Sequence, residues 1–271
     1  MQIRIGYEIV YSCTQVTPMI LTLSVHSSRA QDMVTPDQIK TNPPLPISAY
    51  HDLYGNWVSR LLLPPGDTLI SNDAIIEDSG ERDKMSPDAQ EFPVQTLPPE
   101  TLLYQLGSRY CETDLLSNEA WRLFGNGPTG WHRVQAICDF VHNHIEFSYK
   151  HANNTLTAAQ VYQSGIGVCR DYTHLAVTFC RALNIPARYC MGYLSDIGEP
   201  PPYGEMDFAA WFEAYIDGEW HIFDPRNNKR LIGRILIARG RDAADVSLSN
   251  SFGETVLKSF KVRADEVPVP A

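Results

Sequence analysis

The stretch that decides the fold runs from residue 157 to residue 193 and reads TAAQVYQSGIGVCRDYTHLAVTFCRALNIPARYCMGY. Its Gly-x-Gly segment cannot continue a helix cheaply, because glycine loses the most backbone freedom on ordering. Cys169 then opens a second helix, which we expect to end near Asn184 because Pro186 disfavours helical backbone just before it. Apolar residues at helical spacing predict one buried face for this helix: Leu175, Ala176, Phe179, Ala182 and Leu183. A strand is expected after the proline.

The position of Cys169 at the start of a helix suits it for nucleophilic chemistry. The first amides of a helix have no internal partners, and together with the helix dipole they stabilise a thiolate and can lower the pKa of a cysteine. Arg170 favours the thiolate and Asp171 opposes it. Taken alone, Cys169 is better explained as a small buried residue, as most free cysteines are.

A second stretch, residues 207–225, reads DFAAWFEAYIDGEWHIFDP. Asp217-Gly218 is a strong signal for a tight hairpin turn between two aromatic-rich strands. Pairing about this turn places Trp211 opposite Asp224. Ala209 then lies on the same face as Asp224, because side chains alternate along a strand.

Together these two stretches resemble the transglutaminase-like superfamily, in particular bacterial members with an N-terminal β domain that are regarded as cysteine proteases. The shared features are a cysteine that opens a helix after a Gly-x-Gly loop, and Ala-Trp-x-Glu, Gly-x-Trp and Asp-Pro on a hairpin. The resemblance implies an α+β, papain-like fold in which a helical lobe packs on an antiparallel sheet. It also implies Cys169 as nucleophile, Asp224 as the acid that orients the base, and acyl transfer through a cysteine thioester. Hydrolysis of a peptide or amide is expected rather than protein cross-linking.

The chain departs from the family at the position of the catalytic general base. The family motif is His-Ala-Trp, whereas this chain reads Ala209-Ala210-Trp211. A thiol needs a base or a depressed pKa to attack an amide, and a nearby aspartate without an imidazole disfavours the thiolate. Three interpretations follow: an engineered substitution, recruitment of another histidine, or a pseudoenzyme whose cleft binds a peptide or protein. An acyltransferase with an arylamine acceptor is a more distant alternative on the same fold.

The other histidines are weak replacements for the base. His221 lies three residues from Asp224 on one strand, so it points to the opposite face. His174 lies about 140° around the helix from Cys169, which argues against a direct hydrogen bond. Nothing in the sequence places the remaining candidates beside the thiol: His142, His144 and His151.

Three further acidic features have simple structural explanations. Asp207 and Glu213 share the Ala209 face by parity, but Asp207 is as well explained as a turn residue and Glu213 as a structural part of the motif. The segment at residues 240–245, GRDAAD, resembles one in the same bacterial subgroup. Its carboxylates are better explained as turn caps and an ion pair than as residues of a cleft.

Composition indicates a globular chain of 271 residues, with 44% hydrophobic and 20% charged residues. No apolar run approaches the ~20 residues of a membrane span, and the start, MQIRIGYEIVYS, reads as a strand rather than a signal peptide. The net charge of −10 argues against nucleic acid or an anionic membrane as partner. The six scattered cysteines form no CxxC pair, so no disulfide framework, metal or other cofactor is expected and a cytoplasmic location fits best.

Two domains are predicted. Residues 1–105 look β-rich, include a turn of sequence Asp-x-Tyr-Gly-Asn at residues 52–56, and end in a proline-rich linker at about residues 80–100. Residues 106–271 form the transglutaminase-like part, in which Asp114 and Thr129 are expected to cap two helices. A peptide or protein substrate is expected to lie in the cleft between the helices and the sheet.

Overall fold

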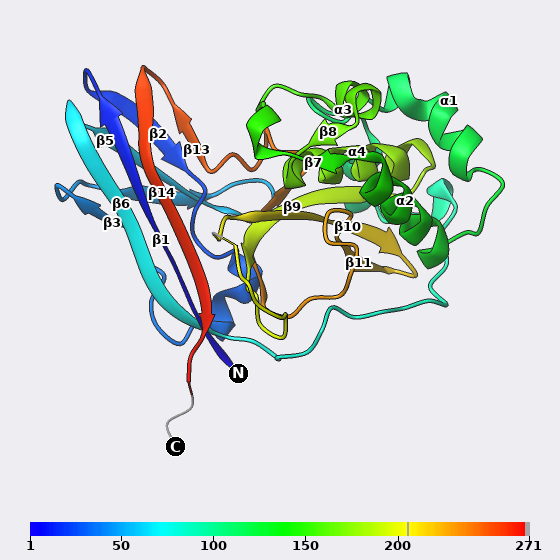
Figure 1. The fold of residues 1–271 in the computed structure, drawn as a ribbon, viewed down its shortest axis with the longest axis horizontal. Helices are drawn as coiled ribbons and strands as arrows, with labels where there is room; N and C mark the ends of the chain where they lie inside the picture. The colour runs from blue at the N-terminus through cyan, green and yellow to red at the C-terminus, as the bar shows by residue number, and fades with distance from the viewer. Residues whose placement is uncertain (205, 269–271) are drawn as a thin grey trace.

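The chain is described by a computed structural model that covers residues 1–204 and 206–268. Two four-stranded antiparallel sheets form an N-terminal β layer, with strand orders β14-β1-β6-β3 and β13-β2-β5-β4 (Figure 1). The strands of this layer are β1 (Gln2–Cys13), β2 (Thr17–Leu21), β3 (Lys40–Asn42), β4 (Ser48–His51), β5 (Trp57–Leu63), β6 (Gly66–Glu77), β13 (Ser249–Ser251) and β14 (Thr255–Glu266).

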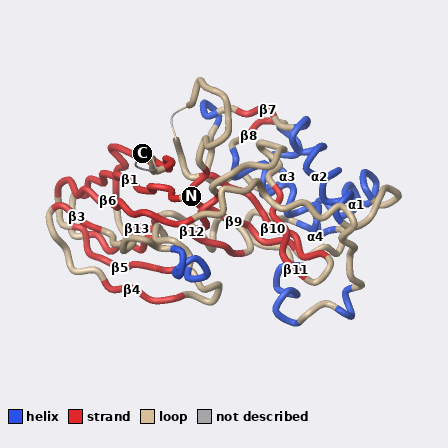
Figure 2. Tube along the Cα trace, turned by 90° about the horizontal axis from the view of Figure 1, so that it is seen from below, coloured by secondary structure: helices blue, strands red, loops and turns tan. Residues whose placement is uncertain are grey.

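A third antiparallel sheet, in the order β11-β10-β9-β12, lies beside this layer and carries the helices (Figure 2). Its strands are β9 (Ala187–Leu194), β10 (Ala209–Ile216), β11 (Glu219–Phe223) and β12 (Arg234–Gly240). The helices are α1 (Thr113–Phe124), α2 (Trp131–His144), α3 (Ala158–Ser164) and α4 (Cys169–Ala182). The short elements are β7 (Glu146–Phe147), β8 (Ile166–Gly167), η1 (Ser27–Asp32), η2 (Val94–Thr96), η3 (Pro99–Gln105) and η4 (Tyr149–His151).

The N-terminal layer and the third sheet share one apolar core. Alternation along β1 buries Ile5 and its neighbours on one face, where they meet Leu61 of β5. The same cluster includes Tyr193 of β9 and Ile235 of β12. Burial of this continuous apolar surface stabilises the contact between the two halves of the chain.

The last two strands differ from the predicted division into residues 1–105 and 106–271. β14 pairs with β1 along nearly its whole length, and β13 pairs with β2. Residues 249–266 therefore complete the N-terminal sheets rather than extend the cysteine-bearing half. The alternating pattern predicts a strand there, but the partner of a strand is non-local and does not follow from its own pattern.

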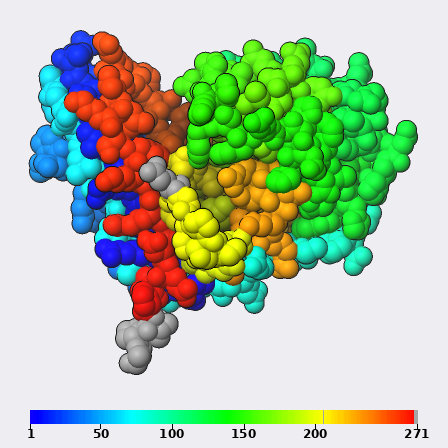
Figure 3. All heavy atoms as spheres, viewed as in Figure 1, coloured from blue at the N-terminus to red at the C-terminus, as the bar shows by residue number. Residues whose placement is uncertain are grey.

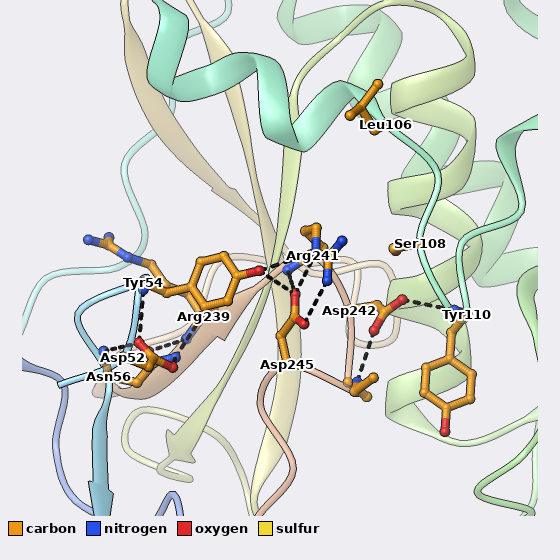
Figure 4. A network of polar contacts seen from close by, with 12 residues as sticks. Asp52, Tyr54, Asn56, Leu106, Ser108, Tyr110, Arg239, Arg241, Asp242 and Asp245 are labelled. Carbon is orange, nitrogen blue, oxygen red and sulfur yellow. Dashed lines mark hydrogen bonds and ion pairs between the residues drawn. The ribbon is translucent and has the colours of Figure 1, made fainter. Parts of the chain in front are cut away.

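The turn at residues 52–56 joins the N-terminal layer to β12 (Figure 4). Its Asn56 side chain exchanges two hydrogen bonds with the backbone of Arg239, each 2.9 Å long. The Tyr54 hydroxyl donates to Asp245 (2.7 Å), which also pairs with Arg241 (2.9 Å). The prediction of an ion pair in the segment at residues 240–245 is confirmed for Asp245. The turn at residues 52–56 and this segment hold each other in place through the Tyr54–Asp245 hydrogen bond.

Asp242 caps a turn, as predicted. Its carboxylate accepts hydrogen bonds from the backbone N–H of Ala244 (2.9 Å) and of Tyr110 (2.8 Å) (Figure 4). The residue is fully buried, so these donors compensate for its loss of hydration. Asp242 thereby anchors the segment that leads into α1 and does not face the candidate site.

Two predicted helix caps are wrong by one or two residues. α1 begins after Glu112, which places Asp114 inside the first turn. α2 begins after Gly130 rather than Thr129. Gly130 has a φ of 63°, and a Cβ atom there would lie 2.1 Å from the carbonyl oxygen of Ala89, so the linker passes too close for any side chain. Among the described residues, no helix has the length and apolar character that crossing a membrane requires.

Candidate active site

Cys169 is the first residue of α4, as predicted. Gly165 ends α3 with a φ of 65°. Gly167 lies so close to α4 that a Cβ atom there would be 2.7 Å from the Cβ atom of Asp171. The Asp171 carboxylate accepts a hydrogen bond of 2.9 Å from the backbone N–H of Val168, which caps the helix. These contacts hold the thiol at the helix N-terminus.

The environment of α4 is more buried than the pattern predicts. Residues 171–181 are buried on all sides rather than along one face. The helix packs against β9 and β10 on one side and against α1, α2 and α3 on the other. Its end agrees with the prediction, because Asn184 adopts the left-handed conformation with a φ of 65°. A helix enclosed in this way gives Cys169 a fixed position.

The hairpin β10–β11 has the predicted turn and register. Asp217 and Gly218 both have positive φ, 53° and 82°. Phe212 pairs with Phe223, so the next pair along the hairpin is Trp211 with Asp224. Ala209 therefore lies on the Asp224 face at the first position of β10, as predicted.

A pocket of about 390 Å³ brings Cys169 and Ala209 together. Tyr149 forms part of its wall and is 60% exposed, so an aromatic face is open to a ligand. The chain around residue 200, yellow in Figure 3, lies on the surface between β14 and the helical half. The side chains that line the pocket include Phe147, Tyr149, Cys169, Asp196, Glu199, Tyr203, Asp207, Ala209, Arg226, Asn227 and Lys229.

The Cys169 thiol is held in its neutral form. Although the residue keeps some exposed surface, the packing around its sulfur raises the pKa of the thiol to about 11, and the negative charge of Asp207 adds to this effect. Hydrogen bonds from the backbone N–H groups of Ala210 and Arg170 act in the opposite direction. Burial thus outweighs the helix terminus, and the expectation of a lowered pKa is wrong for this chain.

Asp224 is buried beside the pocket rather than in its wall. Its Oδ1 accepts a hydrogen bond from the backbone N–H of Asn227 (2.9 Å), and its Oδ2 accepts one from the Asn227 side chain (2.8 Å). Arg234 donates a further hydrogen bond of 2.7 Å to Oδ2. Among the described residues, Oδ1 accepts no hydrogen bond from another side chain. The negative charge of Asp224 also raises the pKa of the Cys169 thiol, as the last of several causes.

None of the eight histidines lines the pocket. His221 pairs with Ala214, on the face opposite Asp224, as predicted, and it packs against Trp131. His174 is fully buried, and its Nε2 accepts a hydrogen bond of 3.1 Å from the backbone N–H of Ala243. The other three candidates bind backbone or hydroxyl groups away from the thiol: His142, His144 and His151.

The two carboxylates of the Ala209 face have different roles. Glu213 pairs with the guanidinium of Arg188 at 2.5 Å and is structural, as predicted. Asp207 lines the pocket with Cys169 and accepts a hydrogen bond of 2.7 Å from the backbone N–H of Phe208. Burial raises the pKa of its carboxyl group. Asp207 therefore faces the same space as the thiol, in a pocket that Asp196 and Glu199 also line.

The residues that sequence reasoning missed lie behind Asp224. Arg234 of β12 binds Asp224 and also Asp83 of the linker, at 3.0 Å, and its guanidinium lies over the ring of Trp211. The sequence holds no signal for this three-residue cluster, because Asp83 lies 151 positions before Arg234. Within the described residues, no group of three or more His, Cys, Asp and Glu side chains is arranged to hold a metal ion.

Comparison with known proteins gives matches to a protein family, to a solved structure and to curated proteins. Residues 121–225 match the family described as the transglutaminase-like superfamily. The crystal structure of a putative cysteine protease from Cytophaga hutchinsonii superposes with a TM-score of 0.85 at 28% identity, covering 100% of this chain and 92% of that one.

Among curated proteins, an uncharacterized protein of Mycobacterium tuberculosis is 31% identical over 116 residues, which is 38% of this chain and 36% of that protein. An uncharacterized protein of Mycobacterium leprae is 34% identical over 87 residues, 30% of each chain. The chain thus matches about a third of the length of these curated relatives.

Proposed function

Because residues 121–225 form a core of the transglutaminase-like superfamily, we propose that the pocket at Cys169 is an acyl-transfer site for peptide amides that lacks its base. In this chain the site binds a peptide but turns it over poorly. The observation that carries the proposal is the neutral thiol in a pocket without an imidazole, with Ala209 on the same face of the hairpin as Asp224.

The chemistry follows from the groups around the thiol. A thiolate at Cys169 attacks the amide carbon, and the leaving amine takes up a proton. The backbone N–H groups of Ala210 and Arg170 face the sulfur, where such donors stabilise an oxyanion. With Ala209, the pocket has no imidazole to remove the thiol proton or to protonate the leaving amine. The pocket can therefore bind a peptide without cleaving it efficiently.

The pocket suits an extended peptide. Its volume of about 390 Å³ lies within the usual range for small-ligand sites and holds one or two residues of a longer chain. Phe147, Tyr149 and Tyr203 line the pocket together with Cys169, so a ligand there meets aromatic side chains. Likeness to a protein named as a cysteine protease favours hydrolysis over cross-linking as the ancestral reaction.

The test is to measure peptide binding and peptide cleavage with the same protein sample. Fluorescently labelled peptides from a random mixture are expected to bind, as fluorescence anisotropy reports, while mass spectrometry finds them intact after long incubation. Alkylation of Cys169 with a bulky maleimide is expected to abolish binding, because the adduct fills the pocket.

The matched control is a Cys169→Ala variant, which should bind peptide normally before and after the maleimide treatment. Efficient cleavage by the unmodified chain would contradict the missing base. Absence of binding to any peptide would contradict the assignment of the pocket.

A further inference from the structure

Among the described residues Asp207 has no cationic partner, and Asp196 of the same pocket has none either. Glu199 pairs with Lys229 and Arg82, and Glu213, outside the pocket, pairs with Arg188. Asp207 accepts one hydrogen bond, from the backbone next to it, and no lysine, arginine or histidine among the described residues pairs with it. A partly buried carboxylate without a counter-ion is unfavourable, so a ligand that supplies one gains binding free energy.

An aromatic ring stands beside this carboxylate. Tyr149, Cys169 and Asp207 line the same pocket, and the charge of Asp207 raises the pKa of both the Tyr149 hydroxyl and the Cys169 thiol. Tyr149 is mostly exposed and its ring is available to a ligand. A carboxylate beside an aromatic ring is the combination that binds ammonium and guanidinium groups, through an ion pair and a cation–π contact.

We infer that Asp207 selects substrates that carry a cationic group, an ammonium or a guanidinium, beside the carbonyl that Cys169 attacks. This inference rests on the proposed function and names its substrate class. The cation has two possible sources, the free α-amine of a peptide or the side chain of a lysine or arginine, which share this chemistry.

The geometry also couples binding to reactivity. Asp207 opposes formation of the thiolate because like charges repel. A substrate cation that neutralises Asp207 removes this repulsion and leaves the hydrogen bonds from Ala210 and Arg170 to act on the sulfur. Cys169 is then more reactive toward a cationic substrate than toward a neutral one of the same shape.

Charge-selective thiol reagents test the inference without any turnover. The rate of Cys169 modification is measured with 2-aminoethyl methanethiosulfonate, which is cationic, and with the neutral methyl reagent, each corrected for its rate with a small free thiol. Cys169 is the one cysteine of the six that is not fully buried, which keeps the readout specific. We expect the cationic reagent to be favoured about tenfold.

Two variants assign the effect. Asp207→Asn should reduce the preference to about that of a neutral site, and Asp196→Asn, which removes a charge elsewhere in the same pocket, should keep most of it. An unchanged preference in Asp207→Asn would overturn the inference. So would an equal loss in both variants, because the effect would then belong to the net charge of the pocket.

Cleavage of matched substrates by the Ala209→His variant distinguishes the two possible sources of the cation. Matched peptide amides carry lysine, acetyl-lysine or norleucine, each with a free or an acetylated N-terminus. Preference for lysine with the N-terminus blocked supports a side-chain cation, and preference for the free N-terminus supports the α-amine. Cleavage without either preference overturns the inference and leaves the proposed function standing. Absence of all cleavage alongside a reagent preference that depends on Asp207 counts against acyl transfer and supports cation binding.

Discussion

Ala209→His is expected to raise the rate of peptide amide hydrolysis by about 10²–10⁴-fold, which is the usual contribution of a positioned acid–base group. Position 209 is the first residue of β10 and lines the pocket with Cys169. Its side chain shares a face with Asp224, so an imidazole at this position is expected to donate a hydrogen bond to the Asp224 carboxylate. The new histidine would take the thiol proton and return it to the leaving amine. The measurement is single-turnover cleavage of a fluorogenic peptide amide.

Two controls separate catalysis from a general effect of the new side chain. Ala209→Gln supplies a polar side chain without a base and should stay inactive. Ala209→His combined with Asp224→Asn keeps the base but removes the charge that orients it, and should lose most of the gain. Equal activity of the histidine and glutamine variants would contradict the account.

Arg234→Met is expected to lower the free energy of unfolding by about 3–5 kcal/mol, because it leaves two carboxylates without their shared cation. Arg234 is buried, and its guanidinium binds Asp224 at 2.7 Å and Asp83 at 3.0 Å. Methionine keeps much of the contact with Trp211, so the decrease in the free energy of unfolding is due mainly to the lost positive charge. Urea unfolding followed by tryptophan fluorescence gives the value.

The matched control is Arg4→Met, which removes an arginine whose ion pair with Asp73 is exposed. Exposed pairs contribute little, so this variant should unfold close to the parent chain. A similar loss in both variants would show that the Asp83–Arg234–Asp224 cluster has no special role in stability.

Local patterns in the sequence predict most of the site scaffold. The turn at Asp217-Gly218 determines the hairpin register, and with it the shared face of Ala209 and Asp224. The glycine loop and Pro186 determine both ends of α4 to within two residues. These predictions succeed because they depend on backbone preferences of residues close together in the chain.

The features that could not be predicted are non-local. The pairing of β14 with β1 joins residues more than 240 positions apart, and the contact of Asp83 with Arg234 spans 151 positions. The pKa of Cys169 depends on how much protein surrounds the sulfur, which sequence does not reveal. A helix terminus lowers the pKa of a thiol and burial raises it, so the direction of the shift follows only from the packed structure.

The most direct test of the central claim is the rate of Cys169 alkylation by iodoacetamide as a function of pH, followed by mass spectrometry. We predict that the apparent pKa lies well above that of an ordinary thiol, about 8.5, so the rate still rises steeply in strongly alkaline solution. Ala209→His should move the rise to lower pH. An apparent pKa below 8.5 in the unmodified chain would contradict the account, because another group would then already activate the thiol.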